Sequence, residues 1–176
     1  MHLSTKFFIA ALIGALTVGL LVAAGAAIYI QQNQRKEARD SEQIREGVRF
    51  LLDAPSAGSS PDVMRMPEAR EILLETLQGD DQVRRRHWAA AKLHYHQGPE
   101  VISALCHALR SDPDSQVRYT SLGTLEYFGQ CGEITSETSE EISRCIRDAL
   151  SDSDNVVRER ASSTLKLFLR GGTVVF

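Results

Sequence analysis

The sequence predicts an all-α protein, a short α-solenoid of helical hairpins preceded by a single transmembrane helix. Two observations lead to this prediction. An acidic turn followed by Val-Arg recurs in residues 77–84, 109–118 and 150–158, and a recurrence at this spacing is typical of stacked helical units. Ahead of these copies, residues 7–30 form an apolar run without a charged side chain, which is the pattern of a membrane-spanning helix.

Residues 1–30 are expected to form an N-terminal membrane anchor. The run of 24 uncharged residues would make a helix of about 36 Å, enough to cross the core of a bilayer. The alternative is a signal peptide cleaved near residues 24–26, Ala-Gly-Ala. Residues 28–30, Ile-Tyr-Ile, continue the apolar run past that point, so we expect an uncleaved anchor.

Small residues recur at every fourth position of the anchor. Such a stripe allows two membrane helices to approach closely, and it suggests a homodimer or a membrane partner; the alternative is the ordinary Ala and Gly content of a membrane helix. The positions are Ala11, Ala15, Gly19, Ala23 and Ala27.

The charges on either side of the anchor favour a cytoplasmic location for the rest of the chain. Lys6 precedes the apolar run, whereas Arg35, Lys36, Arg39 and Arg45 follow it. The excess of Lys and Arg after the run indicates the cytoplasmic side. A short tail with one Lys also precedes many exported, N-terminally anchored domains, so the opposite orientation remains the alternative.

Residues 31–66 are expected to form a helix followed by a linker. Ile44, Val48 and Leu52 follow a four-residue spacing, which indicates an amphipathic helix. This helix either caps the hairpins as a leading half-repeat or is a solvated stalk. Residues 55–67 contain three prolines and are expected to be a loop.

Residues 67–170 are expected to hold three hairpins, at residues 68–97, 99–129 and 139–170, before a tail at residues 171–176. The first helix of each hairpin carries an apolar stripe in a common register. Its members are Ala69, Leu73 and Leu77, then Val101, Leu105 and Leu109, then Ile142, Ile146 and Leu150.

The second helices of the last two hairpins share a register as well. A small residue in this register lets the two helices of a hairpin approach closely, and hairpins of this size bury their apolar faces only by stacking. The residues are Val117, Ser121, Leu125 and Phe128 in one hairpin, and Val157, Ala161, Leu165 and Phe168 in the other.

At these positions the chain resembles a HEAT-repeat protein, including the short bacterial type related to phycobilisome-lyase repeats. The resemblance covers about residues 68–170. It implies that the turn Asp and the helix-start Arg form hydrogen bonds that link successive repeats. The matching residues are Asp112 with Arg118 and Asp152 with Arg158.

The first copy departs from this pattern. Gln78 stands at the position expected for the turn Asp, His87 at the small position, and Ala91 at the position of Leu125 and Leu165. Terminal repeats are often atypical because one of their faces caps the stack. A hydrogen bond from Arg84 to the next repeat is therefore in question.

Composition narrows the class of function. The net charge of −3 argues against nucleic-acid binding, which requires a basic face. Three cysteines are an odd number and do not indicate a disulfide framework. Cys106 and Cys145 are expected to be buried as small apolar residues, and Cys131 to be an exposed thiol in a loop. A Cys131–Cys145 bridge is the alternative, and no sequence pattern supports it.

No motif predicts catalysis, a cofactor or a metal site. His94 and His96 are two residues apart, and this spacing points two helical side chains to different sides, which is unfavourable for a shared metal ion. His94 also falls at the offset of Phe128 and Phe168, where a packed side chain is expected. The sequence contains no His-Glu metal motif, phosphate loop or Gly-flanked nucleophilic Ser.

These observations predict a non-enzymatic adaptor or scaffold that binds a protein partner through the solenoid surface. Arg and Trp are enriched where binding energy concentrates, and the resemblance places the second helices on the concave face. The expected partner surface is Arg85, Arg86, Trp88, Lys92, Tyr119 and Tyr127. A solvated face, or contact with anionic lipid, is the alternative for the basic residues.

Two other functions remain open from the sequence. The resemblance to lyase relatives suggests a lyase-like or chromophore-handling protein, in which Cys131 would be the reactive group. A structural membrane protein, in which the anchor and stalk matter more than the groove, is the other.

Overall fold

The structure is a computed structural model. It describes the backbone of residues 3–53, 61–131 and 135–170 and the side chains of residues 25–53, 62–131 and 135–168. All regular elements in these ranges are helices, so the all-α prediction is confirmed. Contacts divide the chain into two units, Met1–Gln43 and Ile44–Phe176.

The first unit consists of the greater part of α1, which runs over Leu3–Asp53 and ends in the second unit. In the part of the chain that the structure describes, no helix combines the length and the apolar character needed to cross a bilayer. The side chains of residues 7–24, which include most of the predicted anchor and four of the five stripe positions, lie outside the described residues. Ile28, Tyr29 and Ile30 are described and are exposed.

The second unit holds the end of α1 and seven further α-helices of the described chain. The helices are α2 (Pro61–Met64), α3 (Pro67–Gly79), α4 (Val83–Lys92), α5 (Pro99–Ser111), α6 (Ser115–Cys131), α7 (Ser136–Asp148) and α8 (Asn155–Arg170). Short 3-10 turns, η1 (Leu93–Tyr95) and η2 (Ala149–Ser151), follow α4 and α7.

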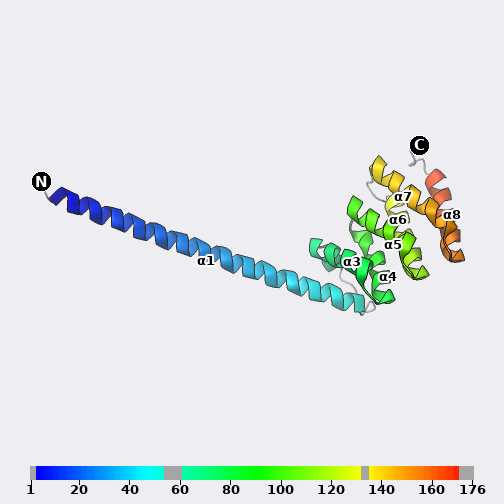
Figure 1. Ribbon diagram of the computed structural model, residues 1–176, viewed down its shortest axis with the longest axis horizontal. Helices are drawn as coiled ribbons and strands as arrows, with labels where there is room; N and C mark the ends of the chain where they lie inside the picture. Colours follow the sequence, from blue (N-terminus) through cyan, green and yellow to red (C-terminus); the bar gives the residue numbers. More distant parts are fainter. Residues whose placement is uncertain (1–2, 54–60, 132–134, 171–176) are drawn as a thin grey trace. The chain divides into compact units, whose positions relative to one another are not determined.

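The helices from α3 onward form pairs that contact one another in two rows. Within pairs, α3 contacts α4, α5 contacts α6, and α7 contacts α8. Between pairs, α3, α5 and α7 form one row of contacts, and α4, α6 and α8 form the other (Figure 1). The ends of these helices follow local signals: Pro67 and Pro99 occupy first turns, and Gly98, with φ of 151°, turns the chain before Pro99.

The core lies between the two rows. Leu73, Leu105 and Ile146 of the first row are fully buried, as the common apolar register predicts. Leu125 and Phe128 of α6 are fully buried opposite them. Val48 and Leu52 near the end of α1 are also buried, so the last turns of α1 complete the same core instead of standing free in solvent.

Candidate functional site: an arginine–aspartate ladder and the α6 surface

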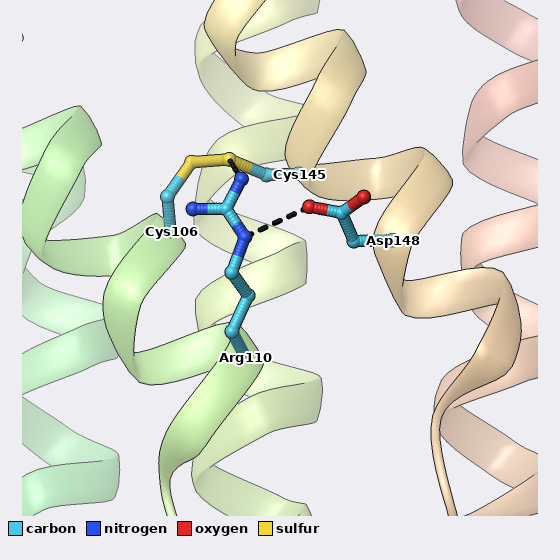
Figure 2. The surroundings of a disulfide bond; sticks show 4 residues. All are labelled: Cys106, Arg110, Cys145 and Asp148. Atoms are coloured by element: carbon cyan, nitrogen blue, oxygen red, sulfur yellow. Dashed lines mark hydrogen bonds and ion pairs between the residues drawn. A yellow bond between two sulfur atoms is a disulfide. The ribbon is translucent and has the colours of Figure 1, made fainter.

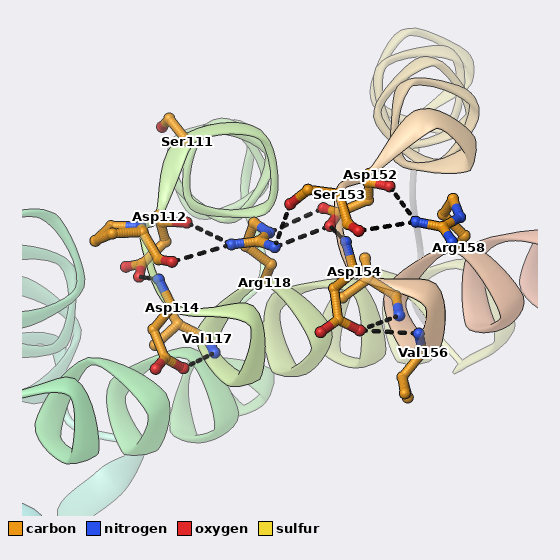
Figure 3. Close-up of polar contacts among 12 residues, drawn as sticks. Ser111, Asp112, Asp114, Val117, Arg118, Asp152, Ser153, Asp154, Val156 and Arg158 are labelled. Carbon is orange, nitrogen blue, oxygen red and sulfur yellow. Dashed lines mark hydrogen bonds and ion pairs between the residues drawn. The ribbon is translucent and has the colours of Figure 1, made fainter.

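Arg118 joins the second helical pair to the third. Its Nε and Nη2 donate to Oδ2 and Oδ1 of Asp152, each at 2.9 Å, while its Nη1 donates to the carbonyl of Asp112 at 2.9 Å (Figure 3). Both side chains are more than nine-tenths buried. A planar guanidinium matched to both oxygens of a carboxylate is a strong and directional contact, so each pair is positioned on its predecessor.

Arg86 repeats this geometry one pair earlier. Its Nε and Nη2 donate to Oδ2 and Oδ1 of Asp112 at 2.8 and 3.0 Å, and its Nη1 donates to the carbonyl of Asp80 at 2.8 Å. We call this series of contacts, Arg86–Asp112 and Arg118–Asp152, the ladder. In each contact the arginine holds the carboxylate of the following pair and a backbone carbonyl of its own turn.

The sequence alignment of the first copy was therefore wrong by two residues. Asp80 and Arg86, not Gln78 and Arg84, stand at the ladder positions, because 32 residues separate Arg86 from Arg118 where the alignment on Val83 assumed 34. Val83 is exposed and is not the counterpart of buried Val117.

The corrected register removes the apparent departures of the first copy. Ala89 takes the small position of Ser121 and Ala161, and all three are fully buried. Leu93, also fully buried, takes the place assigned to Ala91. His96, not His94, takes the position of Phe128 and Phe168 and is 8% exposed. Burial lowers the pKa of the His96 imidazole.

The turn aspartate of each pair also accepts a hydrogen bond from the backbone of its own turn. Oδ1 of Asp80, Asp112 and Asp152 accepts the backbone N–H two residues later at 2.8–2.9 Å. Asp154 accepts the N–H of Val156 at 2.8 Å at the start of α8, a helix-capping contact. Burial of Asp152 opposes ionisation, but the hydrogen bonds from Arg118 and from the N–H of Asp154 lower its pKa.

Arg85 closes the ladder at its first end. Its Nε and Nη2 donate to Asp53 at 2.6 and 2.8 Å, and its Nη1 donates to Asp80 at 3.3 Å. The hydrogen bond from Arg85 lowers the pKa of the Asp53 carboxyl. Arg84 donates to the carbonyl of Asp53 at 2.7 Å. The three arginines thus fix α1 and the first turn, and the basic run that the sequence suggested as a partner surface has internal carboxylates and carbonyls as partners.

Arg158 is the last arginine in the series. Its Nη1 donates to the carbonyls of Asp152 and Ser153 at 2.7 and 2.9 Å, as Arg118 does one pair earlier. No carboxylate of the described residues accepts from its Nε or Nη2.

The other members of the expected partner surface have different surroundings. Trp88 is partly buried against the core, and Nζ of Lys92 lies 5.6 Å from the centre of its ring. Tyr119 and Tyr127 are 37% and 44% exposed on α6. Of the six residues, these two tyrosines are the exposed ones, since Arg86 is buried and the other three are partly buried.

The tyrosines of α6 contact neighbours from η1 and α8. The guanidinium of Arg160 lies 4.4 Å from the centre of the Tyr119 ring and forms an ion pair with Glu126 at 3.1 Å. A Cβ at Gly123 would lie 2.7 Å from Arg160, so the glycine makes room for that guanidinium. The His94 ring meets Tyr127 edge to face at 5.6 Å. We call Tyr119 and Tyr127 with these neighbours the α6 surface.

A disulfide joins α5 to α7 between Cys106 and Cys145, whose Cα atoms are 5.6 Å apart (Figure 2). Both residues are buried, as expected, but the prediction of two unpaired small apolar residues was wrong. Arg110 covers the bond, donating to Sγ of Cys145 at 3.2 Å and to Asp148 at 2.8 Å. Cys131 is a free, exposed cysteine, so the Cys131–Cys145 alternative is also excluded.

The histidines singled out in the sequence have contacts within the fold. No three His, Cys, Asp or Glu side chains in the described ranges are grouped as metal ligands. His94 Nδ1 pairs with the carbonyl of Ala91 at 2.7 Å, and His96 is packed in the core.

No protein-family model, curated protein or solved structure matches this chain. The resemblance to HEAT repeats therefore depends on the internal repeat alone, and no relative assigns an activity.

Proposed function

We propose that this protein is a membrane-anchored, non-enzymatic adaptor that binds a protein partner on the α6 surface. The helical domain would be a short solenoid of HEAT-like hairpins. Three pairs in two rows of contacts support this fold, as does a ladder that repeats with the same atoms at Arg86 and Arg118. Identical contacts at successive pairs are expected when hairpins stack by a common rule.

One observation carries the choice of surface: Tyr119 and Tyr127 are exposed, and each packs its ring against a side chain of a neighbouring element. Tyrosine is enriched at interface hot spots. A side chain that is already ordered loses less conformational entropy when a partner covers it. The ladder arginines, in contrast, would lose buried ion pairs if a partner recruited them.

The membrane anchor is proposed from the sequence of residues 7–30. This run contains no charged residue, and the exposed side chains of Ile28, Tyr29 and Ile30 at its end are of the types that lipid and the membrane interface accommodate.

We propose that the helical domain faces an oxidising compartment, contrary to the orientation favoured by the flanking charges. The Cys106–Cys145 disulfide supports this choice, because structural disulfides persist outside the reducing cytosol. A lyase-like or chromophore-handling role has less support. It would depend on Cys131, and no metal cluster or convergent acid accompanies that thiol in the described residues.

The adaptor is tested by affinity purification of the full-length chain from its own membranes, with quantitative mass spectrometry. We expect a protein that co-purifies with the unchanged chain to be reduced about ten-fold by Tyr119→Ala combined with Tyr127→Ala, in line with hot-spot losses. Ser103→Ala, at an exposed residue of α5 outside the α6 surface, is the control and should retain the partner. Equal recovery with the double variant would exclude the α6 surface as the binding site.

A further inference from the structure

The ladder is incomplete at its last arginine. Arg86 and Arg118 each use Nη1 for their own turn and Nε with Nη2 for the carboxylate of the following pair. Arg158 makes the first of these contacts, to Asp152 and Ser153. Among the described residues, no carboxylate completes the second. The Nε and Nη2 edge of Arg158 can therefore bind a carboxylate, as the same edges of Arg86 and Arg118 do inside the fold.

An exposed apolar side chain lies near this arginine in the chain. Leu77 and Leu109, three residues before Asp80 and Asp112, are 3% and 1% exposed, and Ala149 holds this position before Asp152 at 5%. Leu150 follows it in η2 and is 39% exposed. In the register of the ladder Leu150 takes the position of Arg110, whose side chain contacts Asp148 of the following pair. Among the described residues, the end of the third pair thus presents a free guanidinium edge and an exposed leucine.

We propose that this end, formed by Arg158 and Leu150, docks an acidic turn of a partner polypeptide. The template is internal: the turn at Asp152–Asp154 presents its first carboxylate to Arg118 and uses its second to begin a helix. The partner would place an aspartate of such a turn on Nε and Nη2 of Arg158 and an apolar side chain on Leu150. The inference rests on the proposed adaptor function and names a second contact for it.

Other occupants fit less well. A complete further hairpin would pack along α8, but Ser162 stands where α6 buries Leu122, 40 residues earlier. A polar residue at this position of α8 favours a partner that contacts the turn over one that packs along the helix. A second copy of this chain would offer Asp80, which already accepts from Arg85. Residues 171–176 contain neither Asp nor Glu.

The test uses a photo-crosslinking amino acid, p-benzoylphenylalanine, placed at Leu150 in the full-length chain in its own membranes. A second variant carries the same group at Tyr127, on the α6 surface. We expect an adduct from Leu150 whose cross-linked peptide contains an Asp or Glu. Arg158→Gln should reduce its yield about ten-fold, since a charged hydrogen-bonding pair is lost.

Charge reversal separates binding from a loss of structure. Arg158→Asp should abolish the Leu150 adduct, and replacement of the partner's acidic residue by Arg should restore it. Circular dichroism of each Arg158 variant checks that the helical domain remains folded. Arg158→Lys keeps the charge but cannot donate two parallel hydrogen bonds to a carboxylate, so it should give an intermediate adduct yield.

The remaining outcomes would overturn the inference. A Leu150 adduct with a second copy, with residues 171–176, or with a peptide lacking Asp and Glu would exclude an acidic partner turn. An adduct at Tyr127 without one at Leu150 would be consistent with the adaptor function and would refute docking at Arg158 and Leu150. Adducts at neither position would count against both.

Discussion

The guanidinium of Arg118 holds the carboxylate of Asp152 across the boundary between two helical pairs, with both nitrogen–oxygen distances at 2.9 Å. The contact is almost fully buried. Removal of one member of a buried ion pair leaves the other charged and without a partner, so the ladder makes the stability of each pair depend on its neighbour.

Asp152→Ala is therefore expected to destabilise the helical domain by about 3 kcal/mol. Urea unfolding of the full-length chain in detergent, followed by circular dichroism, measures the change. Asp148→Ala provides a matched control, because Asp148 also pairs with an arginine but is 51% exposed. Exposed pairs contribute at most about 1 kcal/mol. Equal losses for the two variants would contradict a structural role for the ladder.

Gly129→Ala should disrupt the packing of α6 on α8. A Cβ at Gly129 would overlap the ring of Phe168, and enlarging a side chain in a packed interface costs about 1–3 kcal/mol. Gly47→Ala is the control, since no atom lies within 4 Å of a Cβ at that position. In a helix interior, that change should stabilise by about 0.5–1 kcal/mol. Thermal unfolding of the two variants should shift in opposite directions, and a shift of Gly129→Ala to higher temperature would refute the contact.

His96 is expected to make stability fall on mild acidification. Burial lowers the pKa of His96 below its ordinary value of 6.5, and the charges of Arg70 and His94 act in the same direction. The unfolded chain then binds more protons than the folded chain, so stability rises with pH in this window and is lost as pH falls from about 7.5 through 6.5 toward the lowered pKa. Urea midpoints measured between pH 7.5 and 5 report this slope.

His96→Phe should reduce the slope, because Phe occupies the same position in the next two pairs and does not titrate. His107→Gln, a change at an exposed histidine of α5, should leave the slope in place. An undiminished slope in His96→Phe would show that other groups cause it.

The disulfide predicts one accessible thiol in the native protein. A maleimide should label Cys131 alone under non-reducing denaturation and all three cysteines after reduction. Cys106→Ser combined with Cys145→Ser should lower the free energy of unfolding by about 2–4 kcal/mol, whereas Cys131→Ser should have little effect. Labelling of three thiols without reductant, in protein isolated with thiols trapped at lysis, would refute both the bond and the proposed compartment.

The apolar spacing was sufficient to predict much of the fold. Leu73, Leu105 and Ile146 lie in the core as their common register indicated, because a four-residue period leaves one helix face apolar wherever the helix is placed. Local pattern determines such features. The resemblance singled out Asp112, Arg118, Asp152 and Arg158, but in the structure Arg118 pairs with the carboxylate of Asp152 and reaches Asp112 only through its carbonyl.

The first-copy register and the basic run could not be predicted in the same way. Val83 precedes an arginine as Val117 does, and the alignment followed this match; the structure aligns Arg86 instead, because its partner Asp112 lies 26 residues away. Arg85 has a similarly distant partner in Asp53, 32 residues away. Such partners appear only when the helices have been placed. The disulfide was not predicted for the same reason, since an odd number of cysteines does not show which two helices lie side by side.

If residues 1–30 anchor the chain as proposed, the Cys106–Cys145 bond has a mechanical consequence. Tension transmitted through α1 would reach the α3/α4 pair first, and that pair has no covalent link to its successor among the described cysteines. The segment between the two cysteines, which includes all of α6, cannot be drawn out until the bond is reduced. Under load the domain would lengthen from its first pair and keep its tyrosine-bearing helix within a closed covalent loop.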